Sequence, residues 1–146
     1  MRAVQRWRYY CDFCKKAGQS GFHMKNHESV CTLNPVRVCK MCALLDGRSA
    51  ADMTELLAVL PDPALHMVLT TYSRDELRLD DDAITPLIAA ALPVLRELTH
   101  NCPVCILAAL RQKKIPVPLA DGFDYKAEMK SHFDDINGNR EDYEHY

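Results

Sequence analysis

The sequence has no apolar run long enough for a membrane span, which takes roughly 18–20 residues. Its first residues, MRAVQRWRYYCDF, are basic and aromatic, without the apolar middle and cleavage site of a secretory signal. We therefore expect a cytoplasmic protein that makes no contact with a membrane.

Glycine is scarce, with 5 residues among 146, and none belongs to a phosphate-binding loop. No nucleophile is spaced with a histidine and an acid as in a hydrolase. One acidic run, Asp80, Asp81 and Asp82, would suit a metal-dependent nuclease, but its place before a predicted helix makes a cap and a solvated turn the simpler interpretation. We expect no enzymatic activity and no small-molecule substrate.

Charge is distributed unevenly along the chain, whose formal net charge is −2. Residues 1–48 contain nine Lys or Arg against three Asp or Glu, whereas residues 49–146 contain nine against seventeen. This asymmetry suggests a basic module that faces nucleic acid, attached to an acidic body.

Cysteine is the most informative residue type. An odd count without a secretory signal argues against a disulfide framework, and three C-x-x-C pairs would be unusual for a redox enzyme. Ligation of zinc by thiolates accounts for all of them together. The seven are Cys11, Cys14, Cys31, Cys39, Cys42, Cys102 and Cys105.

The first ligand set follows from the pattern C-x2-C-x12-H-x3-C, which comprises Cys11, Cys14, His27 and Cys31. A hairpin turn would hold the first pair of ligands, and one helical turn would place His27 and Cys31 on the same face. An alternative set replaces Cys31 with His23, but it leaves five cysteines for the rest of the chain. We therefore expect His23 to be exposed.

Residues 7–31 resemble a ββα zinc finger with a Cys-Cys-His-Cys ligand set. Such fingers carry an aromatic residue two positions before the first cysteine, here Tyr9, and an apolar residue three before the histidine, here Met24. Gly18 stands where a second aromatic is usual, which puts the hairpin in question. We expect Phe22 to fill the small core instead.

The second ligand set combines the remaining two pairs, Cys39 with Cys42 and Cys102 with Cys105, across 59 residues. Cys102 and Cys105 begin a predicted helix, whose dipole favours thiolates, and Pro103 suits its first turn. The alternative is one free buried pair and one reactive dithiol. With four protein ligands each, both sites lack an open position, so we expect two structural Zn²⁺ ions.

The rest of the chain predicts a mainly α fold with small zinc-stapled β elements. Helices are expected in 49–60, 61–72 and 80–98, and a fourth is expected to start at Pro103. The first and third have apolar faces formed by Met53, Leu56, Leu57 and Leu60, and by Leu87, Ala91, Val94, Leu95 and Leu98. We divide the chain into a basic zinc finger (1–36), a helical body closed by the four-cysteine site (37–114), and an extended connector with a short amphipathic helix and an acidic tail (115–146).

If residues 20–30 form the finger's helix, its outward positions are those that usually reach bases. Surrounding cations would meet phosphates. The candidate nucleic-acid contacts are Arg6, Arg8, Lys15, Ser20, His23, Lys25 and Asn26.

The stretches RYYCDFCKK, HMKNHESVCTLNPVRVCKMC and CPVCILAALRQ resemble small zinc proteins encoded by bacteriophages and prophages. The resemblance implies a bacterial host cytoplasm and a regulatory or host-directed role, without catalytic residues. Three hypotheses follow: a regulator that binds nucleic acid through the finger, a modulator that docks on a host protein complex through the acidic helical body, and a virion or assembly component.

Overall fold

The structure is a computed structural model that describes residues 1–72 and 76–141. It is mainly helical, as the sequence predicts, and contains two small antiparallel sheets. The elements in chain order are β1 (Tyr9–Tyr10), β2 (Ala17–Gly18), α1 (Gly21–Val30), α2 (Lys40–Asp46), α3 (Met53–Val59), the 3-10 helix η1 (Pro63–His66), β3 (Met67–Leu69), β4 (Leu77–Leu79), α4 (Asp81–Thr99), α5 (Pro103–Gln112), the 3-10 helix η2 (Val117–Leu119) and α6 (Tyr125–Glu141).

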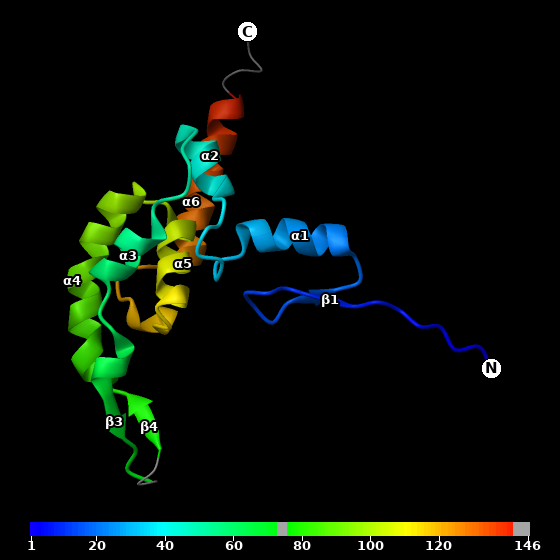
Figure 1. Cartoon of the computed structure of the whole chain (residues 1–146). Coiled ribbons are helices and arrows are strands. Elements are labelled where there is room, and N and C mark those ends of the chain that lie inside the picture. The colour runs from blue at the N-terminus through cyan, green and yellow to red at the C-terminus, as the bar shows by residue number, and fades with distance from the viewer. Residues whose placement is uncertain (73–75, 142–146) are drawn as a thin grey trace.

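The elements form a helical body from which two smaller parts project (Figure 1). Helix α5 lies among α3, α4 and the start of α6, while the β1–β2 hairpin and α1 extend to one side. The β3–β4 ribbon projects at the end of the body. Within the described residues, no helix combines the length and the apolar character that a membrane crossing needs.

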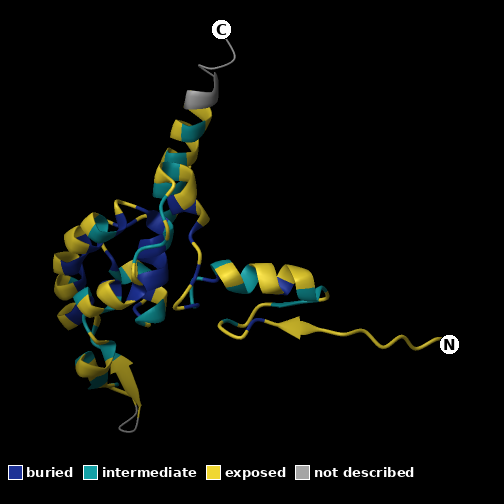
Figure 2. Cartoon of the chain, turned by 45° about the horizontal axis from the view of Figure 1, so that its top comes forward, coloured by how far each residue is buried: buried dark blue, intermediate teal, exposed yellow. Residues whose placement is uncertain are grey.

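Helix α5 is the centre of the core, because six consecutive residues from Cys105 to Leu110 are buried (Figure 2). Pro103 occupies its first turn as predicted, and Cys102 is its N-cap. The α3 face packs against it through Met53, Leu56 and Leu60, also as predicted.

Helix α4 begins after Asp80, whose carboxylate accepts a hydrogen bond from the Ala83 amide, so the start of the acidic run is a helix cap. Its predicted inner face was only partly correct. Leu87 and Val94 are each 43% exposed, whereas Ala91, Leu95 and the half-buried Leu98 do pack on the core. The inner face is completed by Ile84, Ile88, Leu92 and Thr99. Apolar residues occur on most sides of this helix. Periodicity alone therefore did not determine which of two neighbouring faces is buried.

The predicted helix over 61–72 is wrong. Asp62 caps only the single turn η1, after which Met67–Leu69 pairs antiparallel with Leu77–Leu79. Two prolines at 61 and 63 restrict the helix start, and the short apolar run that follows fits a strand as well as a helix.

The predicted extended connector is instead packed against the body. Ile115 and Ala120 are buried, and η2 lies between them. Helix α6 then continues to Glu141, so the first part of the predicted acidic tail is helical, and residues 142–146 lie outside the described residues. Arg96 fastens α6 to α4 by a bidentate pair with Glu128, at 2.7 and 3.1 Å.

Candidate metal centres

The first centre is assembled by the β1–β2 hairpin and α1. Tyr9 pairs with Gly18 and Tyr10 with Ala17, so the hairpin forms although glycine replaces the expected aromatic residue. Close packing at Gly21 supports this arrangement, because a Cβ there would lie 3.2 Å from the Tyr9 ring. The hairpin therefore lies directly against the start of the helix.

The small core beside this hairpin partly differs from the expectation. Met24 is buried as predicted, but Phe22 is 72% exposed and fills nothing. Leu33, just beyond α1, packs against the core instead. Since three of the five core residues are Cys11, Cys14 and Cys31, the core and the candidate ligands are largely the same side chains.

The structure brings together Cys11, Cys14, His27 and Cys31, the set that the spacing predicts. Their ligand atoms all lie within 4.8 Å of one another, and Cys14 Sγ is 3.2 Å from His27 Nε2. His23 is exposed and outside this group. We call these four residues the finger centre.

Backbone amides surround the sulfurs of the finger centre. The Phe13 amide donates to Cys11 Sγ and the Lys16 amide to Cys14 Sγ, both at 3.4 Å. Burial opposes ionisation of Cys11, but the backbone amides of Phe13 and Cys14, with the thiols of Cys14 and Cys31, together lower its pKa. Burial raises the pKa of Cys31. The surroundings therefore favour ionisation of Cys11 and oppose ionisation of Cys31, which a bound cation would favour.

The second centre comprises Cys39, Cys42, Cys102 and Cys105, again within 4.8 Å of one another. Each pair occupies the same local position: Cys39 and Cys102 are N-caps, and their partners lie in the first turns of α2 and α5. All four are buried, with exposed fractions of 6% or less. We call them the body centre.

The thiols of the body centre have pKa values that are shifted in opposite directions. Hydrogen bonds from Cys102 and Cys105 lower the pKa of Cys39, whereas burial raises the pKa of Cys42 to about 12. Hydrogen bonds with Cys105 and Cys39, together with burial, raise the pKa of Cys102.

The sulfur–sulfur distances in the body centre fit a tetrahedral metal better than disulfides. Cys39 Sγ and Cys102 Sγ are 3.6 Å apart, and Cys42 Sγ and Cys105 Sγ are 3.5 Å apart. Zn–S bonds of about 2.3 Å in a tetrahedron put the sulfurs about 3.8 Å apart, against about 2.05 Å in a disulfide. The cysteines are all free.

Arg37 provides an independent test of the body centre. Its side chain is buried, with the residue only 6% exposed, and no carboxylate pairs with it in the described part of the chain. Its Nη1 donates to Cys105 Sγ at 3.7 Å, and its Nε has no partner. A buried cation is costly unless an anion compensates it. Four thiolates around a divalent ion carry a net charge of −2, so Arg37 fits a metal-loaded centre.

The end of α5 is hydrogen-bonded to the segment that follows the finger centre, which the sequence did not predict. We call these hydrogen bonds the clasp. Gln112 Nε2 donates to the carbonyl oxygens of Thr32 and Asn34 at 2.9 and 3.1 Å, and Arg111 donates to Thr32 Oγ1. Both donors come from the end of α5, about 80 residues from their acceptors. No local pattern signals such a contact.

The predicted nucleic-acid contacts are mostly on the surface. Ser20 is half-buried, and its hydroxyl oxygen accepts the His23 amide as the cap of α1. The others are exposed: Arg6, Arg8, Lys15, His23, Lys25 and Asn26.

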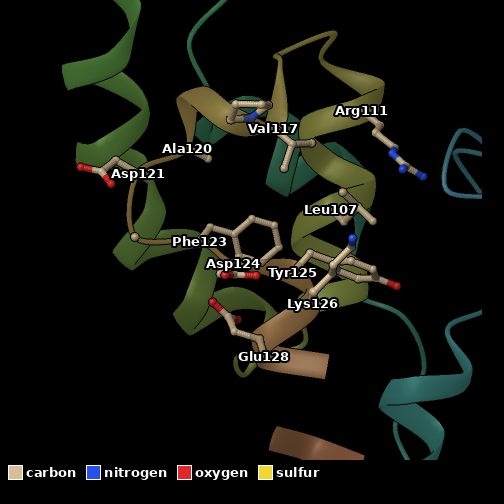
Figure 3. Close-up of a pocket in the computed structure, with 12 residues that line it drawn as sticks. Leu107, Arg111, Val117, Ala120, Asp121, Phe123, Asp124, Tyr125, Lys126 and Glu128 are labelled. Carbon is tan, nitrogen blue, oxygen red and sulfur yellow. The ribbon is translucent and has the colours of Figure 1, made fainter. Parts of the chain in front are cut away.

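A hollow of about 700 Å³ lies away from both centres, between α5, η2 and the start of α6 (Figure 3). Leu107 and Phe123 face into it, while Arg111 and Asp121 point outward. Of its other acids, Glu128 is paired with Arg96, and Asp124 accepts a hydrogen bond from the Ala127 amide. The hollow therefore presents an apolar wall without a convergent set of free polar groups.

Fold and site together define a cysteine-rich helical protein with two four-residue groups that could each hold a metal ion. Comparison of the chain with models of protein families, with curated proteins and with solved structures finds no match.

Proposed function

We propose that this chain is a non-enzymatic zinc protein that binds nucleic acid through its N-terminal module, residues 1–31. Two Zn²⁺ ions would complete the finger and body centres. Every position around each ion is filled by a protein ligand, so both ions would serve structure and neither would activate water. The resemblance to phage-encoded proteins suggests a regulatory role in a bacterial host.

The unpaired positive charge of the module carries this proposal. Six cations lie within residues 1–31 against two acids, and all six are exposed. Within the described residues, none of the six takes part in an ion pair. A set of free cations on one side of an acidic protein is the electrostatic footprint of a polyanion partner. The cations are Arg2, Arg6, Arg8, Lys15, Lys16 and Lys25.

Binding of a labelled mixed-sequence oligonucleotide by the zinc-loaded chain tests the proposal. Affinity should fall steeply with salt, because neutralised phosphates release counterions. An Arg6→Gln, Arg8→Gln double variant should bind oligonucleotides of every sequence more weakly than the parent chain does. The matched control is Lys114→Gln with Lys126→Gln, two exposed cations of the body, which should change little. No retention at low salt on single or double strands would exclude this function.

One observation favours the second candidate, a protein partner. One face of the β3–β4 ribbon is apolar. Met67 lies opposite Leu79 and Leu69 opposite Leu77, so these four side chains share that face. Met67, Leu69 and Leu77 are 39%, 61% and 58% exposed. An isolated two-stranded ribbon is marginally stable, and exposed apolar faces mark interaction sites. Pull-down from a bacterial lysate with a Leu69→Lys control would test this candidate.

A further inference from the structure

The N-terminal module exposes more aromatic surface than its small core requires. Trp7 is 78% exposed, Phe22 72% and Tyr10 64%. The body also has exposed rings, Tyr72 at 100% and Phe133 at 46%, but they are not adjacent in the sequence as Trp7 and Tyr10 nearly are. Exposing rings of this size to water is unfavourable, so their exposure indicates a surface that binds a partner.

Trp7 lies between two cations, and two further rings follow directly, in the sequence Arg6-Trp7-Arg8-Tyr9-Tyr10. Arg6, Trp7 and Arg8 line one side of a hollow of about 450 Å³, and the β2 end of the hairpin, Ala17 to Gln19, lines the other. The arm before β1 has no regular secondary structure and extends away from the body, exposed along its whole length (Figures 1 and 2).

We propose that the arm and the β1–β2 hairpin bind single-stranded nucleic acid, with an unpaired base stacked on Trp7 and the flanking phosphates on Arg6 and Arg8. This inference rests on the proposed function and specifies its ligand. Every base has a π-face, so stacking on aromatic rings suits single strands of any sequence.

A duplex would make poor use of this surface. Its bases are stacked on one another and offer only their edges in the grooves, which exposed ring faces cannot read. A single strand offers faces for the rings and phosphates for the arginines at the same time. Trp7 between Arg6 and Arg8, on an extended and exposed arm, matches that requirement.

A protein partner would also use tryptophan, tyrosine and arginine. The charge of the module favours nucleic acid over a protein, because residues 1–31 contain six cations and only two acids, Asp12 and Glu28. The backbone amide of Asp12 already donates to the Glu28 carboxylate. Free charge of one sign therefore favours a phosphate backbone.

The experiment uses Trp7 as its own reporter, since it is the only tryptophan in the chain. The full zinc-loaded protein is titrated with oligothymidylate and, separately, with a duplex of equal length. We expect quenching of tryptophan fluorescence by the single strand, together with at least about tenfold tighter binding than to the duplex, as measured by anisotropy of a labelled oligonucleotide.

Variants then separate stacking from charge. Trp7→Ala should weaken oligothymidylate binding about 5- to 150-fold, the range for loss of one stacked base, whereas Trp7→Phe should lose less. The matched control is Phe133→Ala, an aromatic of α6 that is 46% exposed, which should not change binding. All variants keep the metal ligands, and metal content confirms their folding.

The outcomes are distinguishable. Duplex binding with unchanged tryptophan fluorescence would overturn this inference and leave the proposed function standing. Equal affinities of Trp7→Ala and the parent chain for oligothymidylate would also overturn it. Binding of neither nucleic acid at low salt would overturn both and point to a protein partner.

Discussion

The two candidate metal centres have the same number of ligands but opposite relations to the fold. The finger centre gathers residues within 21 positions of one another, and Cys14 and His27 remain half-buried. The body centre joins pairs separated by 59 residues and is buried completely. One metal would therefore organise a local module, and the other would connect the beginning of the body to its central helix.

The two centres also differ in the size of the hydrophobic core around them. The body centre lies within a core of more than twenty buried residues, whereas the finger core has three buried residues, two of which are ligands. Hydrophobic burial contributes much of the stability around the body centre and little around the finger centre. The difference separates two roles: a metal that adds to an existing core and a metal that replaces one.

The largest expected effect comes from Cys105→Ser. This substitution removes a buried ligand at the start of the most buried helix, α5. A structural zinc site contributes about 10 kcal/mol or more, comparable to the roughly 5–15 kcal/mol of a whole domain. We expect loss of cooperative thermal unfolding, measured by circular dichroism. A variant that unfolds like the parent and keeps two metal ions would contradict a structural role for the body centre.

The next effect is confined to the finger. Cys14→Ser should reduce the bound metal from two ions to one and unfold α1, because its core contains little besides ligands and Met24. Two-dimensional amide spectra should lose dispersion for residues 9–31 and keep it for the body. If the body also collapsed, the two centres would be one cooperative unit, and the comparison above would fail.

Much of the metal chemistry could be predicted from the sequence, because ligand spacing is a local property. Two cysteines on a turn and two ligands one helical turn apart define the finger set, and subtraction leaves Cys39, Cys42, Cys102 and Cys105. The mainly helical fold followed equally from apolar periodicity and helix caps.

What could not be predicted depends on contacts between distant residues. Met67–Leu69 becomes a strand only because Leu77–Leu79 lies opposite it. Arg37 appears in the sequence as an ordinary basic residue of the N-terminal half, and its burial depends on α5. The clasp from Gln112 spans about 80 residues. None of these leaves a short-range pattern.

The third prediction concerns the charge of the body centre. Arg37→Met should weaken zinc binding about 10- to 150-fold, equivalent to the roughly 1.5–3 kcal/mol of a hydrogen bond to a charged group. Competition with a chelator measures this, and Arg37→Lys should lose less. Arg48→Met is the control, since that side chain is 36% exposed and pairs with Asp46 at the surface. Tighter binding in Arg37→Met would mean that the centre is not anionic.

The smallest effect tests how the two regions are joined. Gln112→Ala removes two hydrogen bonds that hold the segment between the centres, at the Thr32 and Asn34 carbonyl oxygens. Each contributes about 1 kcal/mol, too little to unfold either part, so both metals and the body's cooperative unfolding should remain. The finger should instead tumble more independently, which backbone ¹⁵N relaxation of residues 9–31 measures. Gln19→Ala, at an exposed hairpin position, is the control. Unchanged relaxation would place the connection elsewhere, at the Val38 amide and the Ser29 carbonyl, 2.8 Å apart, or at the Asn34 side chain, which donates to the Glu28 carbonyl at 2.8 Å.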